Sequence, residues 1–125
     1  MLRNRNAVAN LAVKDLKAAR KYYEGTLGFE PAASEGEELV AYRSGGSTFN
    51  VYQSKEAGSN KATAVTWSVG NDVRKVVEWL KGKGVTFEHY AMPGLTLEGD
   101  VHVGDGMEVA WFKDPDGNIL NIVNR

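Results

Sequence analysis

Two parts of this 125-residue chain repeat the same pattern of residue types, and this duplication constrains the fold more than any other feature. The segment Asp-Leu-Lys-Ala-Ala-Arg-Lys-Tyr-Tyr-Glu-Gly at 15–25 recurs as Asp-Val-Arg-Lys-Val-Val-Glu-Trp-Leu-Lys-Gly at 72–82. Val-Ala-Tyr at 40–42 and Phe-Asn-Val at 49–51 recur as Val-Ala-Trp at 109–111 and Leu-Asn-Ile at 120–122. The offset is 57 residues at the first pair and about 70 at the later pairs. We infer that one structural unit is duplicated and that its second copy contains a longer loop.

Composition is that of a globular domain. With 42% hydrophobic residues, we expect residues 1–125 to form a single domain with a buried core. Apolar runs are short and the N-terminus lacks the apolar core of a signal peptide, so we expect no membrane role and a cytoplasmic location. The lack of cysteine removes disulfide and thiolate chemistry. A net charge of -1 with interspersed signs argues against a nucleic-acid partner.

The first copy, module 5–53, has the pattern of a βαβββ unit. Residues 8–13 alternate as a strand does, and Asp15 is a suitable N-cap for a helix that ends at Gly28. Strands are predicted at 29–33, 38–43 and 48–53, with a turn at 44–47 between the last two. The polar segment 54–61 is interpreted as a linker.

The second copy, module 62–125, has the same order of elements. We predict a strand at 62–69, a helix that starts at Asn71 or Asp72 and ends near Gly82 and Gly84, and strands at 85–89, 107–113 and 119–123. An Asp-Pro-Asp-Gly-Asn turn joins the last two strands. The intervening segment 91–106 is rich in glycine, and we interpret it as a flap over a ligand groove, with a short strand at 100–103.

This pattern resembles the vicinal oxygen chelate superfamily, which includes glyoxalase I, extradiol dioxygenases, and the fosfomycin and bleomycin resistance proteins. The resemblance rests on Leu-x-Val-x-Asp-Leu at 11–16, on Tyr-Tyr-x-x-x-Leu-Gly-Phe at 22–29 and on the turn at 114–118. It implies an α+β fold in which tandem βαβββ modules form a curled, open barrel-like mixed sheet with the helices outside. It also implies a ligand groove between the modules and a homodimer.

Metal-dependent members of this superfamily bind a divalent ion through His or Glu side chains on the first and last strands of each module. The matching positions in this chain are Val8, Asn50, Ala64 and Asn121. Two aliphatic side chains and two amides cannot replace the hydration shell of a divalent ion. The resemblance therefore implies the fold without its metal site, and we expect no cofactor.

Strand alternation separates the residues that should face the helices from those that should face the groove. The groove-facing set contains five apolar residues, which are Val8, Ala12, Ala64, Ile119 and Val123. Its polar members are Asn10, Thr48, Asn50, Tyr52, Thr66, Ser68 and Asn121. Amide and hydroxyl groups of this kind suit a small organic ligand that is held by hydrogen bonds and shape.

The register of the hairpin at 107–123 determines which other side chains reach the groove. If Lys113 pairs with Asn118, then Glu108 and Phe112 face the groove, and the repeat adds Arg43. A shift of one residue would direct Trp111 and Tyr42 inward instead. The sequence leaves both registers open.

The two histidines differ in their surroundings. His89 lies at the end of a predicted strand, where a solvated side chain is expected. His102 lies in the predicted flap and, with Glu108, is a candidate general acid–base pair. The structural alternative is that His102 is an incidental loop residue.

Three functions fit these observations. The leading hypothesis is a metal-independent small-molecule binding protein of the bleomycin-resistance type, which holds an aromatic or polar organic compound and lowers its free concentration. The second is a glyoxalase-like isomerase, lyase or hydrolase that uses His102, Glu108 or Tyr52. The third is a metal-dependent enzyme with displaced ligands drawn from Glu88, His89, His102 and Glu108.

Overall fold

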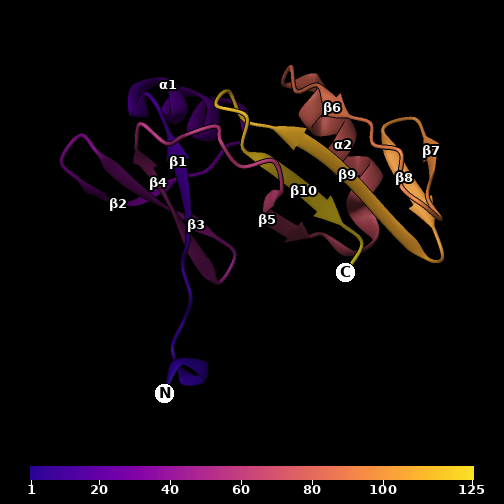
Figure 1. The fold of residues 1–125 in the computed structure, drawn as a ribbon, viewed down its shortest axis with the longest axis horizontal. Coiled ribbons are helices and arrows are strands. Elements are labelled where there is room, and N and C mark those ends of the chain that lie inside the picture. Colours follow the sequence, from indigo (N-terminus) through magenta and orange to yellow (C-terminus); the bar gives the residue numbers. More distant parts are fainter. The chain divides into compact units, whose positions relative to one another are not determined.

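Each half of the chain folds around its own mixed β-sheet. In the computed structural model, which describes residues 1–125 apart from the side chain of Glu35, the two halves are the units Met1–Ser59 and Asn60–Arg125. Helices pack against one face of each sheet (Figure 1). The α+β class with mixed sheets, which the duplicated sequence predicts, is confirmed. Among the described residues, none of the helices has the length and apolar character needed to cross a bilayer.

The first unit contains a four-stranded sheet. Its elements are η1 (Leu2–Asn4), β1 (Ala9–Val13), α1 (Leu16–Arg20), the π-helix η2 (Lys21–Thr26), β2 (Pro31–Glu35), β3 (Leu39–Ser44) and β4 (Ser47–Gln53). The strand order is β1-β4-β3-β2, and only β1 and β4 run parallel. The Asp15 carboxylate accepts hydrogen bonds from the first backbone N–H groups of α1, as an N-cap does. Gly28, with φ of 81°, follows the end of η2.

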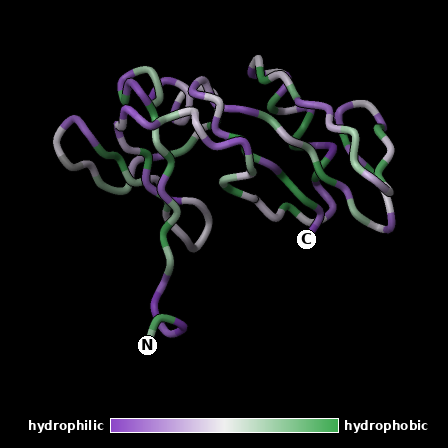
Figure 2. The backbone as a smooth tube through the Cα atoms, in the orientation of Figure 1, coloured by the Kyte–Doolittle hydropathy of each residue, from purple (hydrophilic) through white to green (hydrophobic). Residues whose placement is uncertain are grey.

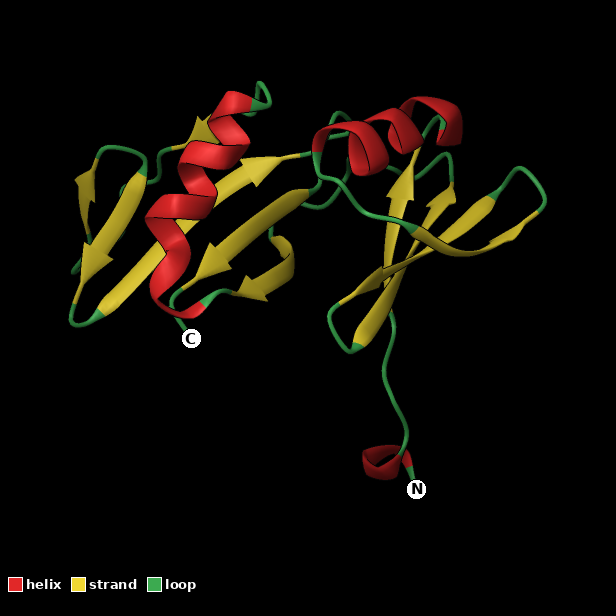
Figure 3. Ribbon diagram, turned by 180° about the vertical axis from the view of Figure 1, so that it is seen from behind, coloured by secondary structure: helices red, strands yellow, loops and turns green.

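The second unit contains a six-stranded sheet. Its elements are β5 (Thr63–Ser68), η3 (Gly70–Asp72), α2 (Val73–Gly82), β6 (Phe87–Glu88), β7 (Thr96–Glu98), β8 (Val101–Gly104), β9 (Met107–Lys113) and β10 (Ile119–Val123). The order is β5-β10-β9-β8-β7, and β6 also pairs with β9. Helix α2 crosses one face of this sheet (Figure 3).

The segment 91–106 is not the flap that we expected from its glycine content. Its second half forms β7 and β8, which extend the sheet beyond β9. The reason lies at Asp105 and Gly106, whose φ angles of 51° and 76° are those of a two-residue hairpin turn. This turn returns the chain directly into β9 and places His102 opposite Val109 in the sheet. The short strand predicted at 100–103 is confirmed as β8.

The face of each sheet that packs against the helices, here named the helix face, holds the core. In the first unit the alternation predicted from the sequence is confirmed, since Leu11, Val13, Phe49 and Val51 are buried on this face. In the second unit, Leu120 and Ile122 occupy the same positions in β10 and are also buried. However, all five residues of β10 are buried, and four of them are apolar (Figure 2). The side of the second sheet that faces away from α2 is therefore not a simple polar surface.

A buried tyrosine connects β3 to the helical segment of the first unit. The Tyr42 side chain is fully buried, and its hydroxyl donates a hydrogen bond of 2.8 Å to Glu24 Oε2. Arg20 Nε donates to the same oxygen at 2.6 Å. Burial raises the pKa of Tyr42, and the hydrogen bond to Glu24 raises it further. Burial also opposes ionisation of Glu24, but the hydrogen bonds from Arg20 and Tyr42 outweigh it and lower the pKa of this carboxyl group.

We expect Tyr42→Phe to lower the free energy of unfolding by about 1–3 kcal/mol at neutral pH, because Glu24 loses one of its two donors. The folded pKa of Glu24 lies below its usual value of 4.5. The stabilisation is therefore fully present above that pH and is lost as the pH falls through the folded pKa. Urea unfolding at pH 7 and pH 3 should show a smaller difference at pH 3. The control Tyr52→Phe, at a half-buried tyrosine of β4, should change stability by less than about 0.5 kcal/mol.

Candidate functional site

The pairing of β9 with β10 determines which side chains of the second sheet face away from α2. Trp111 lies opposite Asn121, and Phe112 lies opposite Leu120. Partners in a β-ladder share a face, so Phe112 and Glu108 lie on the helix face and Trp111 lies on the other side, here named the opposite face. The expectation that Glu108 and Phe112 face a ligand groove is therefore wrong. The alternative register that the sequence left open, shifted by one residue, occurs in this hairpin and directs Trp111 away from α2.

The cause of this register is the buried aspartate at the start of the turn. Asp114 Oδ1 accepts hydrogen bonds from the backbone N–H groups of Asp116 and Asn118, at 3.0 and 2.8 Å. The backbone N–H of Asp114 donates to the carbonyl of Asn118. Asp114, and not Lys113, therefore pairs with Asn118, and Lys113 moves opposite Ile119.

The hairpin of the first unit keeps the unshifted register. Tyr42 lies opposite Phe49 on the helix face, whereas Arg43 lies opposite Thr48 on the opposite face. A tighter turn explains the difference, because Ser44 pairs with Ser47 across only two residues. Within the repeat, Trp111 therefore occupies the place of Ala41, and not that of Tyr42 as the sequence alignment suggested.

The opposite face of the first unit is polar and mostly accessible. Asn10 and Asn50 are neighbours in the β1–β4 ladder, and Asn50 Nδ2 donates to Asn10 Oδ1 at 3.1 Å. Thr48, Arg43 and Asn10 are exposed, and Asn50 and Tyr52 are half-buried. These side chains lie on the face that the sequence predicted for them. Ligand binding by any of them stays a prediction.

The opposite face of the second unit is aromatic and largely buried. The ring of Trp111 packs edge-to-face against Tyr90 and against His102, with centroids 5.3 and 4.8 Å apart. Val109, Ile119 and Val123 complete this buried cluster, and Leu95 packs against it. The indole N–H of Trp111 donates to Thr63 Oγ1 at 3.1 Å, which sets the orientation of the ring. We call this set the Trp111 cluster.

A pocket of about 220 Å³ opens beside the Trp111 cluster. It is lined by Lys61, Ala62, Thr63, Tyr90, Met92, Trp111 and Ile119. Two aromatic rings and three apolar side chains provide most of this lining, together with one hydroxyl and one amine. Such a lining can bind an aromatic or apolar compound through the apolar surface that the compound buries against it. We take this pocket as the candidate functional site and name it the aromatic pocket.

Polar atoms without a partner lie within the same cluster. Tyr90 Oη, His102 Nδ1 and Asn121 Oδ1 are buried and form no hydrogen bond in the described chain. The side chains of His102 and Asn121 are only 1% and 8% exposed. Thr66, the ladder neighbour of Asn121, is exposed, as is Ser68. The cluster thus offers hydrogen-bonding capacity that the protein itself leaves unused.

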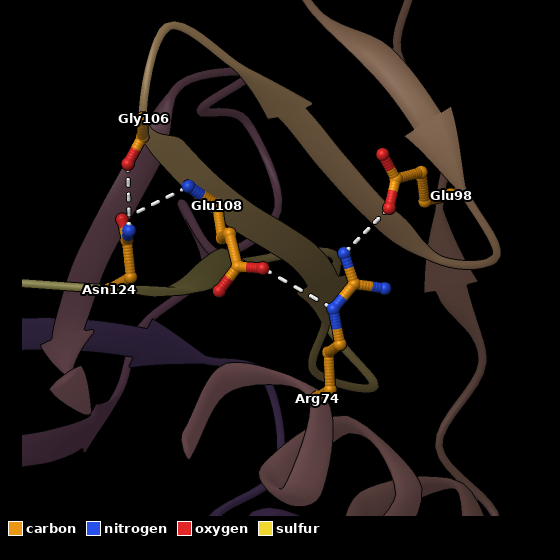
Figure 4. Close-up of polar contacts among 5 residues, drawn as sticks. All are labelled: Arg74, Glu98, Gly106, Glu108 and Asn124. Atoms are coloured by element: carbon orange, nitrogen blue, oxygen red, sulfur yellow. Dashed lines mark hydrogen bonds and ion pairs between the residues drawn. The ribbon is translucent and has the colours of Figure 1, made fainter. Parts of the chain in front are cut away.

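His102 and Glu108 do not form the acid–base pair that the sequence suggested. They lie on opposite faces of the second sheet, because His102 pairs with Val109 and Glu108 pairs with Val103. Glu108 instead accepts a hydrogen bond of 3.3 Å from Arg74 of α2, and its backbone N–H donates to Asn124 (Figure 4). The Glu108 carboxylate thus takes part in packing α2 against the sheet.

A second depression, of about 300 Å³, lies between α2 and the β7–β8 hairpin and is lined by charged side chains. Arg74 pairs with Glu98 at 2.8 Å, and Lys81 pairs with Asp100 at 2.8 Å (Figure 4 shows the first). His89 Nε2 also contacts Asp100 at 2.7 Å. Hydrogen bonds from Lys81 and His89 hold the pKa of Asp100 below its usual range. These ion pairs hold the β7–β8 hairpin against α2. Because the carboxylates already pair with the cations, the depression is a poor ligand site.

The residues at the metal positions of the superfamily do not fit a divalent ion. Asn121 is buried beside Trp111, Asn50 is bonded to Asn10, and Val8 and Ala64 are aliphatic. The described side chains contain no cluster of three or more His, Asp or Glu residues arranged to hold a metal. Of the displaced set, His89 and His102 lie with their ring centroids 6.4 Å apart, but Glu88 lies near Lys113 and Glu108 binds Arg74.

Two units of this strand order, each with a helix on one face of its sheet, define a protein of the duplicated βαβββ class. The chain belongs to the Glyoxalase/Bleomycin resistance protein/Dioxygenase superfamily, which it matches over residues 6–122. The resemblance inferred from the sequence is therefore confirmed. No curated protein matches the chain in sequence.

Solved structures with the same fold include proteins of different activities. The glyoxalase family protein from Enterococcus faecalis has a TM-score of 0.72 and 18% identity, over 98% of this chain and 99% of that one. A bleomycin-binding protein complexed with bleomycin has a TM-score of 0.71 and 17% identity, over 97% and 98%. Lactoylglutathione lyase from Agrobacterium tumefaciens has a TM-score of 0.65 and 17% identity, over 95% and 93%. At these identities the likeness shows the fold alone.

Sequence reasoning missed the central residues of the aromatic pocket. The sequence directs Trp111 inward only in the alternative register, and its pattern does not single out Tyr90, Met92 or Thr63 as site residues. The one sequence signal for this register is Asp114, since an aspartate at the start of a turn commonly accepts a hydrogen bond from the backbone N–H two residues later. That signal would have favoured the register in which Trp111 faces away from α2.

Proposed function

We propose that this protein binds a small organic molecule in the aromatic pocket without a metal ion, and that it holds the compound without transforming it. The observation that carries the proposal is the Trp111–Tyr90 lining of a 220 Å³ pocket, in a family member whose metal positions hold no ligand side chains. Aromatic side chains provide large contact areas with directional packing, and this can supply affinity for a planar compound.

Binding is favoured over catalysis by the chemistry of the pocket. The candidate acid–base pair is split between two faces of the sheet, and Glu108 is engaged by Arg74. The bleomycin-binding protein of the same fold is a precedent for a member that holds a compound. By sequestration, the protein would contribute to resistance against a toxic compound such as an antibiotic.

The proposal extends to the assembly and location of the protein. A cytoplasmic homodimer is the form that we propose. Light scattering coupled to size-exclusion chromatography tests the dimer. A monomer at micromolar concentration would contradict it.

A thermal-shift panel of aromatic natural products and antibiotics tests the binding function. A compound present at 100 times its dissociation constant should stabilise the fold by about 2.7 kcal/mol, and the effect should persist in EDTA. Trp111→Phe should weaken the binding of such a compound at least about tenfold, because it removes contact area and the hydrogen bond to Thr63.

The matched control is Trp79→Phe, which changes an exposed tryptophan of the same unit and should leave the affinity unchanged. Binding that is equal in the wild type and in Trp111→Phe would contradict the proposed site. Binding that requires zinc, iron or manganese would contradict the metal-independent mechanism. Turnover of a bound compound would contradict a role in holding alone.

A further inference from the structure

The three unpaired polar atoms near the aromatic pocket belong to residues that surround one side chain. Tyr90 and His102 pack against the Trp111 ring, and Asn121 lies directly opposite Trp111 in the β9–β10 ladder. Buried polar groups in folded proteins are normally hydrogen-bonded, because an unpaired group loses its bonds to water without replacement. Three exceptions in one cluster therefore need a common explanation.

The hydrogen-bonding direction of His102 follows from its one bond. The backbone N–H of Tyr90 donates to His102 Nε2 at 2.9 Å, so Nε2 is the acceptor nitrogen of the ring. The ring in this arrangement is neutral and carries its hydrogen on Nδ1, which is therefore a donor without an acceptor. Asn121 Oδ1 is an acceptor without a donor, and the Tyr90 hydroxyl can act in either direction.

The following inference rests on the proposed function. We propose that the aromatic pocket binds a planar, uncharged aromatic compound whose edge carries both a hydrogen-bond acceptor and a donor, as a cyclic amide does. The acceptor of the compound pairs with His102 Nδ1–H or the Tyr90 hydroxyl, and its donor pairs with Asn121 Oδ1. The ring packs against Trp111.

Size and charge narrow this class of compound. A volume of 220 Å³ is below the roughly 300–1,000 Å³ that is usual for drug-sized ligands, so a core of one or two rings fits. The one charged side chain in the pocket lining, Lys61, is exposed, and a ligand whose charged group lay beside the three unpaired atoms would lose its hydration without a counter-charge there. Tyr90 lines the aromatic pocket, whereas His102 and Asn121 are not among its lining residues, so the proposed contacts require the half-buried Tyr90 and the exposed Met92 to move.

Four two-ring probes of similar size separate the contributions of the ring and of its edge. The probe 2-quinolinone carries both an acceptor and a donor on its edge, quinoline carries an acceptor, indole carries a donor, and naphthalene carries neither. We expect 2-quinolinone to bind about 10- to 100-fold more tightly than naphthalene in isothermal titration calorimetry, with quinoline and indole between them.

Tyr90→Phe removes one hydroxyl while keeping the ring that contacts Trp111. This variant should weaken 2-quinolinone binding about 3- to 10-fold and leave naphthalene binding unchanged. The control Tyr22→Phe, at a tyrosine of η2 in the first unit, should change neither affinity.

The results separate this inference from the proposed function. Equal affinities for 2-quinolinone and naphthalene, or an equal loss for both in Tyr90→Phe, overturn the donor–acceptor requirement and leave the aromatic pocket in place. If none of the four probes binds although a compound of the larger panel depends on Trp111, the inference fails alone. If no compound of either set depends on Trp111, both fail.

Discussion

Phe112→Ala should lower the free energy of unfolding by about 3–5 kcal/mol, the range seen when a large aromatic side chain is removed from a core. Phe112 is only 2% exposed, and its ring packs against Trp67 and Phe87 with centroids 6.5 and 5.6 Å apart. The truncation leaves a cavity on the helix face that rigid neighbours fill only in part. Guanidinium unfolding followed by circular dichroism measures the change.

This experiment also tests the register of β9. The control Met107→Ala removes a side chain that is 43% exposed on the same strand and should change stability by about 0.5 kcal/mol or less. If Phe112 faced a ligand instead of α2, Phe112→Ala would cost little stability and would abolish binding. A loss below about 1 kcal/mol together with lost binding would contradict the register described here.

Gly104→Ala should destabilise the fold by about 1–3 kcal/mol and displace the segment that covers the Trp111 cluster. A Cβ atom at Gly104 would lie 2.0 Å from the carbonyl oxygen of Gly94, a backbone atom that no side-chain rotation can move. The segment 90–95 would have to shift. Tyr90 and Leu95, which pack against the cluster, shift with it.

Hydrogen exchange detects this displacement at the backbone N–H of Tyr90, which is protected by His102 in the native fold. We expect faster exchange at Tyr90 in Gly104→Ala and weaker binding of any compound in the aromatic pocket. The control Gly82→Ala adds a methyl group at the end of α2, where the space is open, and should be neutral or stabilising by up to about 1 kcal/mol. Unchanged protection of Tyr90 would show that segment 90–95 is not held by this close approach.

Local sequence patterns predicted the elements because each depends on a few adjacent residues. Asp15 caps α1 and Gly28 follows η2 at the predicted places. The alternation in β1 and β4 assigned the faces correctly, because each of these strands has one apolar and one polar side. In β10, however, Ile, Leu, Ile and Val occupy both sides, and alternation cannot separate them.

The β8–β9 hairpin shows how a glycine-rich segment can mislead. Its glycines suggested a mobile flap, but Asp105 and Gly106 use their positive φ angles to build a tight turn. Asp-Gly between two short strands is a recognised signal for a hairpin turn, and here it decides the structure against the glycine content of the segment. This hairpin carries His102 into the Trp111 cluster, so the error also hid part of the candidate site.

By itself the sequence determined the duplication, the superfamily and the replacement of metal ligands by amide and aliphatic groups, since these depend only on which residues stand at which positions. The tertiary structure decided which face of β9 holds Trp111 and which holds Phe112. A single residue of register exchanges the two faces of a strand, and here that residue was set by the hydrogen bonds of a buried aspartate in the turn.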